Sequence, residues 1–327
     1  MGSRLSITFH KRGKKQQVTS QTEETTKMDS VETDLPAMSA GSTTAGATQT
    51  SMFSHRDFHT SETASYWLPK DEEEQDRLTG QHFALKELFG GNVLPIVGQH
   101  VPLDNNAKIL DIGCGGGTWI LDMATEYPNC DYEGVDIVDV AKSHLWPERA
   151  HFKCGNILEP LDFPDNTFDL VNMRLFVLAL RETEWPLAIQ EALRVTKPGG
   201  ILHLTEVDYK LTGNVVVQDM IKTIHAECAS RGQNPHIVTQ LERILNEKGA
   251  VVLEKTEKEV SLVGDTGISK KFVWDWKHGL KSGLPVLGPK LGLHDEESQR
   301  KFLEDIISNM SSSQANTYFT AIAAQKA

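Results

Sequence analysis

The stretch Lys-Ile-Leu-Asp-Ile-Gly-Cys-Gly-Gly-Gly-Thr-Trp at residues 108–119 decides the fold class. The run Ile109–Ile112 predicts a buried strand, and alternating glycines follow it directly, before a helix predicted over Thr118–Tyr127. Glycine has no Cβ, so such a turn can adopt positive φ and let a nucleotide-like ligand lie against bare backbone. The Gly-x-Gly-x-Gly pattern alone is a weak signal, so the sequence around it decides whether this interpretation holds.

Strand and helix patterns alternate after this stretch. Further strands are predicted over Tyr132–Ile137, His151–Cys154, Phe168–Met173 and Ile201–Val207, with a helix over Trp185–Val195 and a turn at Lys197–Gly200. The remainder predicts a helix over Val238–Asn246, a strand over Val251–Val260, mostly helix over Lys271–Met310 and a last strand over Thr317–Ala323. Repeated strand–helix units imply a mainly parallel sheet with helices on both faces.

The N-terminal 55 residues have a different composition. Residues 1–55 are rich in Ser, Thr, Gln and Ala, and we expect a disordered tail because so few large apolar residues cannot offset the entropy of ordering. The basic cluster Lys11–Lys15 is either a nuclear-import signal or an ordinary solvated run. Order is expected from about Phe58 onward.

An amphipathic helix is predicted between the tail and the glycine stretch. The acidic run Asp71–Asp76 suits a helix N-terminus, which carries partial positive charge. Leu78, His82, Leu85 and Phe89 recur at helical spacing, and two glycines then end the helix.

Composition excludes several classes of protein. The chain has 327 residues and a net charge of −12, which argues against a dedicated nucleic-acid binder. It has no run of eighteen apolar residues and no signal-peptide pattern, so we expect no membrane span and a cytoplasmic or nuclear location. The four cysteines have no metal-ligand spacing and are expected to be reduced thiols, with no metal site.

Two acidic residues support a nucleotide-like site. Asp136 ends the second predicted strand, where a carboxylate can accept hydrogen bonds from both hydroxyls of a ribose. Its alternative role is that of a helix N-cap or loop carboxylate. Asp111 precedes the turn and is expected to brace it by accepting backbone N–H bonds. Cys114, inside the turn, is interpreted as a small packing residue rather than a nucleophile.

Later strand ends add polar groups to the same edge of the sheet. Asn156 could bond an adenine amino group while Ile157 stacks on the ring, or Asn156 could instead form an Asx turn. Asn172, Met173 and Arg174 end the fourth strand and are expected to line the same crevice, because open α/β sheets bind ligands at carboxyl ends of strands.

These motifs, together with Leu193–Gly200, resemble the ordered motifs of class I S-adenosylmethionine-dependent methyltransferases over residues 105–210. The pattern departs from the dinucleotide motif GxGxxG, because residue 118 is Thr and residue 120 is Ile. The resemblance implies S-adenosylmethionine as cofactor. The residues implied to bind it are Tyr66, Asp111, Gly113, Cys114, Gly115, Gly117, Asp136, Ile137, Asn156, Ile157, Asn172 and Met173.

Residues 66–86 are similar to the N-terminal block of fungal LaeA-like methyltransferases. This resemblance implies a Rossmann-like, seven-stranded, mostly parallel sheet with an antiparallel final strand, an N-terminal helical cap and a helical insertion before the last strand. It divides the chain into a tail (1–55) and a methyltransferase domain (56–327). The domain comprises a cap (56–104), a cofactor-binding core (105–210) and C-terminal strands with a helical lid (211–327).

The acceptor and any general base are less well defined. His82 and Glu206 are the candidates for a base, with His203 inside the fifth strand as a weaker one. Tyr66 and Trp67 could close over the cofactor or act as apolar anchors. Trp274, Trp276 and His278 either shape an acceptor pocket or form the core of the lid.

Three functions follow from the resemblance. The first is methyl transfer to a small molecule, such as a secondary metabolite. The second is a nuclear regulator of secondary metabolism that works through protein partners. The third is a cofactor-binding scaffold without turnover.

Overall fold

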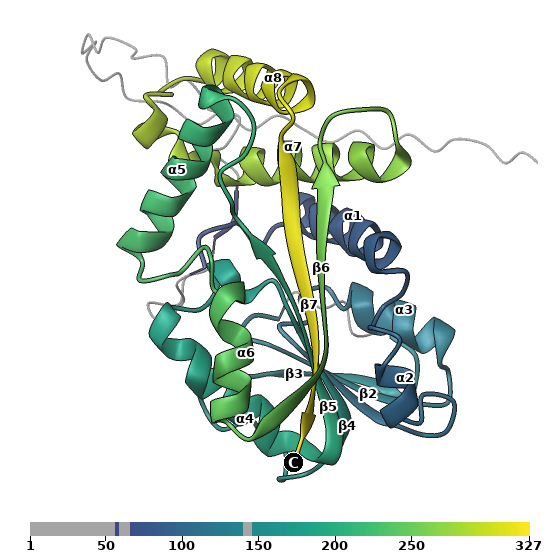
Figure 1. The fold of residues 1–327 in the computed structure, drawn as a ribbon. Coiled ribbons are helices and arrows are strands. Elements are labelled where there is room, and N and C mark those ends of the chain that lie inside the picture. Colours follow the sequence, from purple (N-terminus) through teal and green to yellow (C-terminus); the bar gives the residue numbers. More distant parts are fainter. Residues whose placement is uncertain (1–55, 59–65, 140–145) are drawn as a thin grey trace, which may run out of the picture. The chain divides into compact units, whose positions relative to one another are not determined.

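A seven-stranded sheet of order β3-β2-β1-β4-β5-β7-β6 organises the protein (Figure 1). The computed structural model describes residues 56–58, 66–139 and 146–327, so the predicted tail and its basic cluster lie outside the described residues. The strands are β1 (Lys108–Ile112), β2 (Asp131–Asp136), β3 (Ala150–Cys154), β4 (Phe168–Arg174), β5 (Thr196–Asp208), β6 (Ala250–Ser261) and β7 (Asn316–Lys326).

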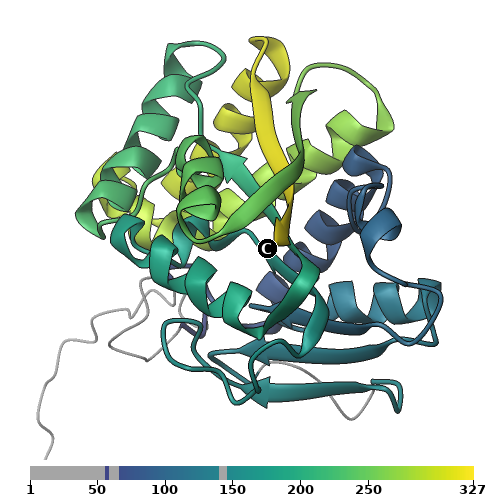
Figure 2. The same ribbon diagram turned by 60° about the horizontal axis from the view of Figure 1, so that its bottom comes forward.

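Strand direction confirms the predicted fold class. The pairs β1–β2, β1–β4, β2–β3 and β4–β5 are parallel, whereas β7 is antiparallel to both β5 and β6. Figure 2 shows the yellow strand β7 beside the green strand β6, which ends the sheet at that edge.

Helices cover both faces of this sheet. They are α1 (Glu72–Phe89), α2 (Val97–His100), α3 (Thr118–Glu126), α4 (Trp185–Val195), α5 (Val215–Ser230), α6 (Val238–Glu247), α7 (Gly267–Leu287) and α8 (Glu296–Ser312). Helices α4 and α6 lie on one face, and α2 and α3 on the other (Figure 1). Helices α7 and α8 form the predicted insertion before the last strand. In the described part of the chain, no helix combines the length and apolar character that crossing a membrane requires.

Helix α1 has the boundaries that its sequence signals predicted. The side chain of Asp71 accepts a hydrogen bond from Glu74 N at 3.1 Å, and Gly90 ends the helix with φ of 78°. A left-handed residue after the last turn is the usual use of glycine at a helix C-terminus.

Helix α5 was not predicted from the sequence. It begins with three valines, a residue type that favours strands, directly after Asn214. The Asn214 side chain accepts a hydrogen bond from Val217 N at 3.2 Å, so the cap and burial of one helix face override the local propensity.

The predicted turn at Lys197–Gly200 is instead part of β5. Phe168 pairs with Thr196 and Leu170 with Ile201, so extra residues bulge from β5 between these two pairs. Gly199 takes φ of 78° inside the bulge, which explains why the sequence has the Gly signal of a turn.

Side chains on the central strands alternate between two apolar clusters. Ile109 and Leu170 join the cluster with Trp119, whereas their neighbours Leu110 and Val171 join the cluster with Trp185. All six are nearly or completely buried. This alternation places Asp111, Asn172 and His203 in one row, because they pair across β1, β4 and β5.

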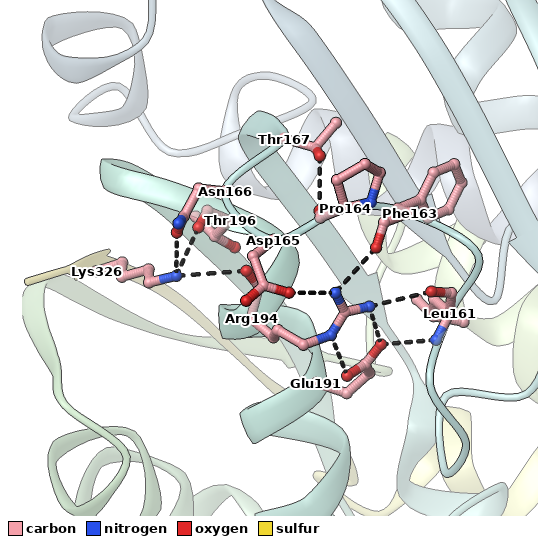
Figure 3. A network of polar contacts seen from close by, with 10 residues as sticks. All are labelled: Leu161, Phe163, Pro164, Asp165, Asn166, Thr167, Glu191, Arg194, Thr196 and Lys326. Atoms are coloured by element: carbon pink, nitrogen blue, oxygen red, sulfur yellow. Dashed lines mark hydrogen bonds and ion pairs between the residues drawn. The ribbon is translucent and has the colours of Figure 1, made fainter.

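A polar network closes the amino ends of β4 and β5 (Figure 3). Arg194 donates to Asp165 Oδ1 at 2.6 Å and to Phe163 O at 2.9 Å, and it pairs with Glu191. Lys326, at the end of β7, donates to Thr196 O at 2.8 Å. The network therefore fixes the edge of the sheet opposite the carboxyl ends of its parallel strands.

Candidate functional site

One large pocket, of about 320 Å³, opens at the carboxyl ends of the parallel strands. This volume is at the lower end of the range typical of ligand sites. Most of the predicted binding residues line it: Tyr66, Asp111, Gly113, Cys114, Gly115, Asp136, Ile137, Asn156 and Ile157. The candidate base His82 lines it as well.

The glycine loop between β1 and α3 forms the floor of this pocket. Gly113, Gly115 and Gly117 have φ of 69°, 51° and 83°, in the left-handed region that favours glycine. A Cβ on Gly113 would lie 2.5 Å from the ring of Phe176, so only glycine fits there without movement. The loop consequently presents bare backbone to the pocket.

Asp136, rather than Asp111, braces this loop. Gly115 N donates to Asp136 Oδ2 at 2.9 Å, and Val138 N donates to Asp136 Oδ1 at 3.1 Å. The prediction that Asp111 accepts backbone N–H bonds is wrong, because its carboxylate accepts from the side chain of Asn172 at 2.7 Å. Asp136 therefore holds the glycine loop and faces the pocket at the same time.

Asn156 performs the alternative role predicted for it while lining the pocket. Its Oδ1 accepts a hydrogen bond from Leu158 N at 3.1 Å, which is an Asx turn. Since Asn156 and Ile157 both line the pocket after β3, the turn places them on the same wall as Asp136.

Four predicted residues do not reach the pocket wall, namely Gly117, Asn172, Met173 and Glu206. Gly117 begins α3 and has Trp146 against it. Asn172 and Met173 precede the last residue of β4 and are fully buried on opposite faces of the sheet.

Asn172 is the centre of a buried row of hydrogen bonds. Its amide donates to Asp111, and its Oδ1 lies 3.0 Å from His203 Nδ1. His203 Nε2 accepts from Leu94 N at 3.3 Å, so His203 is neutral with its proton on Nδ1. Burial lowers the pKa of His203 to about 3 and raises the pKa of Asp111 to about 6. With both ring nitrogens engaged, His203 is a structural residue.

Glu206 also has a structural position. Its carboxyl group is buried and accepts from Phe176 N at 2.6 Å and from Val177 N at 3.1 Å. These bonds hold the short helix η2 (Phe176–Leu178), whose preceding residue Leu175 takes an unfavourable φ of 62°. Burial raises the pKa of Glu206 to about 8. Glu206 thus shapes the pocket wall from behind and does not suit the role of a base.

His82 faces the pocket from α1 but has both ring nitrogens occupied. Its Nε2 lies 3.0 Å from Asp122 Oδ2, and its Nδ1 lies 3.3 Å from Arg174 Nη1. Because a guanidinium can only donate, Nδ1 is the acceptor and Nε2 carries the proton. Burial, with Arg174 nearby, lowers the pKa of His82 to about 4. His82 is therefore neutral near pH 7, with no free nitrogen for a proton.

Helix α1 contacts the glycine loop from above. Gln75 Oε1 accepts from Gly116 N at 3.1 Å, and the hydroxyl groups of Thr79 and Thr118 lie 3.1 Å apart. Tyr66 and Trp67 also line the pocket, and burial raises the pKa of Tyr66. Gln75 was missed because nothing in a helix sequence signals a bond to a loop 41 residues away.

A buried charge cluster joins α1 to α7 at the pocket. Arg77 donates to Glu74 Oε1 at 2.7 Å and to Asp275 Oδ1 at 2.8 Å. Asp275 also accepts from Gln81 at 2.9 Å, and Glu74 from Ser282 at 2.6 Å. Arg77 and Asp275 both line the pocket. Helix α7 is thereby fixed as a wall of the site.

Much of the rest of the pocket lining is apolar. Its side chains include Phe176, Leu180, Val207, Trp276, Leu280 and Phe319. Of the aromatic residues predicted for an acceptor pocket or lid core, only Trp276 lines the pocket, where it stacks edge-on against Tyr209 with ring centroids 5.9 Å apart. Trp274 is 40% exposed and packs on Gly80 of α1, with His278 bonded to its carbonyl oxygen.

Comparison with known proteins gives the class of domain. Residues 109–200 match the family model of a methyltransferase domain. The chain is 32% identical over 150 residues to the secondary metabolism regulator laeA of Coprinopsis cinerea, covering 45% of this chain and 37% of the relative. It is 29% identical over 144 residues to methyltransferase str2 of Strobilurus tenacellus, covering 44% and 50%. The matches thus span half or less of the length of these curated relatives.

Among solved structures, phosphoethanolamine N-methyltransferase 2 of Haemonchus contortus aligns with a TM-score of 0.48 and 18% identity. The alignment covers 79% of this chain and 59% of that one.

The sheet topology, the glycine loop and Asp136 are those of the class I methyltransferase fold, and residues 109–200 match the model of a methyltransferase domain. Within that class the chain resembles the fungal LaeA-like proteins, as its N-terminal block predicted.

S-adenosylmethionine is the cofactor that this domain implies, and the residues present fit it. The loop at Gly113 and Gly115 is a cradle that a Cβ at Gly113 would obstruct. Asp136 offers a carboxylate, and Asn156 and Ile157 offer an amide and an apolar side chain on the same wall. These are the groups that a ribose and an adenine ring require.

Proposed function

We propose that this protein transfers the methyl group of S-adenosylmethionine to a small-molecule acceptor, of the secondary-metabolite type. The observation that carries the proposal is one pocket lined by Asp136, by bare glycine backbone and by many apolar side chains. The names of the relatives, a secondary metabolism regulator and a methyltransferase, agree with this class of acceptor.

Different groups of lining residues would contact different parts of the cofactor. Asp136 would accept the ribose hydroxyl groups, and Asn156 and Ile157 would hold the adenine ring. The glycine loop at Gly113 and Gly115, together with Tyr66, would lie against the methionine part. The other residues predicted to bind, Gly117, Asn172 and Met173, would act by supporting this loop and the strand end.

The chemistry that the cofactor supplies when bound is an electrophilic methyl carbon. The protein's own residues orient the acceptor against it and exclude water, which can contribute several kcal/mol to lowering the barrier. The apolar wall around Phe176 and Trp276 suits an acceptor with an apolar body. We assign no general base, because the ring nitrogens of His82 and His203 are engaged and the Glu206 carboxyl accepts backbone N–H bonds.

We also propose the division of labour that the sequence suggested. Residues 56–104 would cap the cofactor through α1, residues 105–210 would bind it, and residues 211–327 would form the acceptor side through α7. The contacts of Gln75 with the glycine loop and of Arg77 with Asp275 support this division.

A second candidate function rests on the 32% identity to a secondary metabolism regulator. In that case the protein would work in the nucleus through protein partners, with or without turnover. Deletion of residues 1–55 separates the two candidates. Methyl transfer that survives the deletion supports the metabolite enzyme, and loss of all turnover counts against it.

The direct test is incubation of the purified protein with methyl-labelled S-adenosylmethionine and a small-molecule cell extract. We expect a labelled product of low molecular mass, absent with Asp136→Ala and retained with Asp131→Ala. Asp131 is a matched control, because it lies on the same strand at the end away from the pocket. Label only in protein, or none at all, would refute the proposal.

A further inference from the structure

Arg174 is the one residue of the predicted group Asn172–Arg174 that reaches the pocket. It ends β4 on the same face as Asn172, one pleat nearer the carboxyl edge. Its side chain is half-buried at the pocket, and desolvation lowers its pKa. A positive group thus lines a pocket that also has many apolar side chains.

The charge of Arg174 has no ion-pair partner within the described ranges 56–58, 66–139 and 146–327. Its side chain contacts His82 Nδ1 at 3.3 Å and the ring of Trp119, whose centroid lies 5.9 Å away. Arg77, the other arginine in the pocket wall, by contrast contacts two carboxylates. A guanidinium has five N–H donors, so the contact with His82 leaves Arg174 with donors for a ligand in the pocket that it lines.

His82 holds Arg174 in this orientation. Asp122 accepts a hydrogen bond from the Nε2–H of His82, which leaves Nδ1 as an acceptor for the guanidinium. Lys86 also binds Asp122, at 2.7 Å, so the negative charge of Asp122 is already balanced. Arg174 is therefore oriented by a neutral ring, and the two carboxylates that act on its charge, Asp111 and Asp122, form no direct ion pair with it.

We propose that Arg174 is a carboxylate-binding residue of the pocket, oriented by His82. This inference rests on the proposed function, and the carboxylate could belong to the methionine part of the cofactor or to the acceptor. A monoanion suits the site, because the carboxylates of Asp111 and Asp136 also line the pocket and would repel a second negative charge. The planar guanidinium fork matches the two oxygens of a carboxylate.

The test measures binding by calorimetry to wild type, Arg174→Gln and Arg174→Lys, with Arg243→Gln as an exposed control. The probes are S-adenosylhomocysteine, its decarboxylated analogue, and then benzoate against benzamide on the S-adenosylhomocysteine complex. Arg174→Lys keeps the charge without the fork and should be intermediate.

If the carboxylate is that of methionine, Arg174→Gln weakens the binding of S-adenosylhomocysteine at least about tenfold and leaves the affinity for the decarboxylated analogue unchanged. If it belongs to the acceptor, S-adenosylhomocysteine binds as before and the preference for benzoate over benzamide disappears. Equal binding of all probes by wild type and Arg174→Gln would overturn the inference. Failure of wild type to bind S-adenosylhomocysteine would instead overturn the proposed function.

The positioning role of His82 has its own readout, the ratio of affinities for the carboxylated and the neutral probe. His82→Gln supplies a side-chain oxygen that can accept from Arg174 and should keep the ratio, whereas His82→Phe should lower it. A ratio unchanged in His82→Phe would remove His82 from the account.

Discussion

Replacing Arg77 with methionine should destabilise the protein, chiefly because two buried carboxylates lose the positive charge that pairs with them. Glu74 is fully buried and Asp275 is 7% exposed, and Arg77 bridges them. In Arg77→Met, Glu74 retains its bond from Ser282, and Asp275 retains its bond from Gln81. Breaking a buried ion pair in this way costs about 3–5 kcal/mol.

Protonation of one carboxyl group limits that cost and makes it depend on pH. Holding a proton at about pH 7 on a group with an ordinary pKa of about 3.9 costs about 4 kcal/mol, at about 1.4 kcal/mol per pH unit. In Arg77→Met the folded pKa is raised, so the loss of stability grows as pH rises. We expect a loss of about 4 kcal/mol at about pH 7 and of about 1–2 kcal/mol at about pH 5.

Urea unfolding of wild type and Arg77→Met at both pH values measures this loss. The matched control is the triple variant Glu74→Gln/Arg77→Met/Asp275→Asn, which removes all three charges and should recover most of the stability. A loss below about 1 kcal/mol, or one equal at both pH values, would refute the reasoning. So would a triple variant as unstable as the single one.

Three further predictions concern the pocket wall. Gly113→Ala should lower the free energy of unfolding by at least about 2 kcal/mol, because the position has positive φ and a Cβ there would clash with Phe176. Gly199→Ala is the control, because Gly199 has a similar φ but open space around it, so its loss of stability reports the backbone strain alone. Equal losses of stability in thermal unfolding of the two variants would exclude the clash. The pKa of Glu206 is raised to about 8 from 4.5, so its stabilisation is lost as pH rises through 8. The stability of Glu206→Gln in urea unfolding should therefore rise relative to that of wild type between about pH 6 and pH 9. A difference in stability that stays constant over this range would contradict the prediction. The pKa of His82 is lowered to about 4 from 6.5, so wild type should lose stability as pH falls from 6.5 to 4. His82→Gln should lose less stability over this range. Parallel curves of stability against pH for the two proteins would argue against a neutral His82.

The sequence predicted the core of the fold because its signals are local. The glycine loop, Asp136 at the end of β2 and the caps of α1 each depend on a few neighbouring residues. The sequence did not predict helix α5, because its first residues are valines, which favour strands. Its cap could be recognised only together with the burial of one helix face.

The pocket wall was less predictable because it is assembled from distant segments. Arg77 and Asp275 are 198 residues apart, and nothing local to either one signals the pair. The choice among Asn172, Met173 and Arg174 depends on which pleat of β4 stands above the edge of the sheet. The sequence could have favoured Arg174 there, since it is the last residue of the strand.

The central claim is that Asp136 and the glycine loop bind the ribose side of S-adenosylmethionine. Calorimetric titration of S-adenosylhomocysteine into wild type, Asp136→Ala and Asp131→Ala tests it most directly. Loss of hydrogen bonds to a charged group is worth about 1.5–3 kcal/mol, so Asp136→Ala should bind about 10- to 100-fold more weakly, with Asp131→Ala like wild type. Equal affinity of all three proteins would contradict the account.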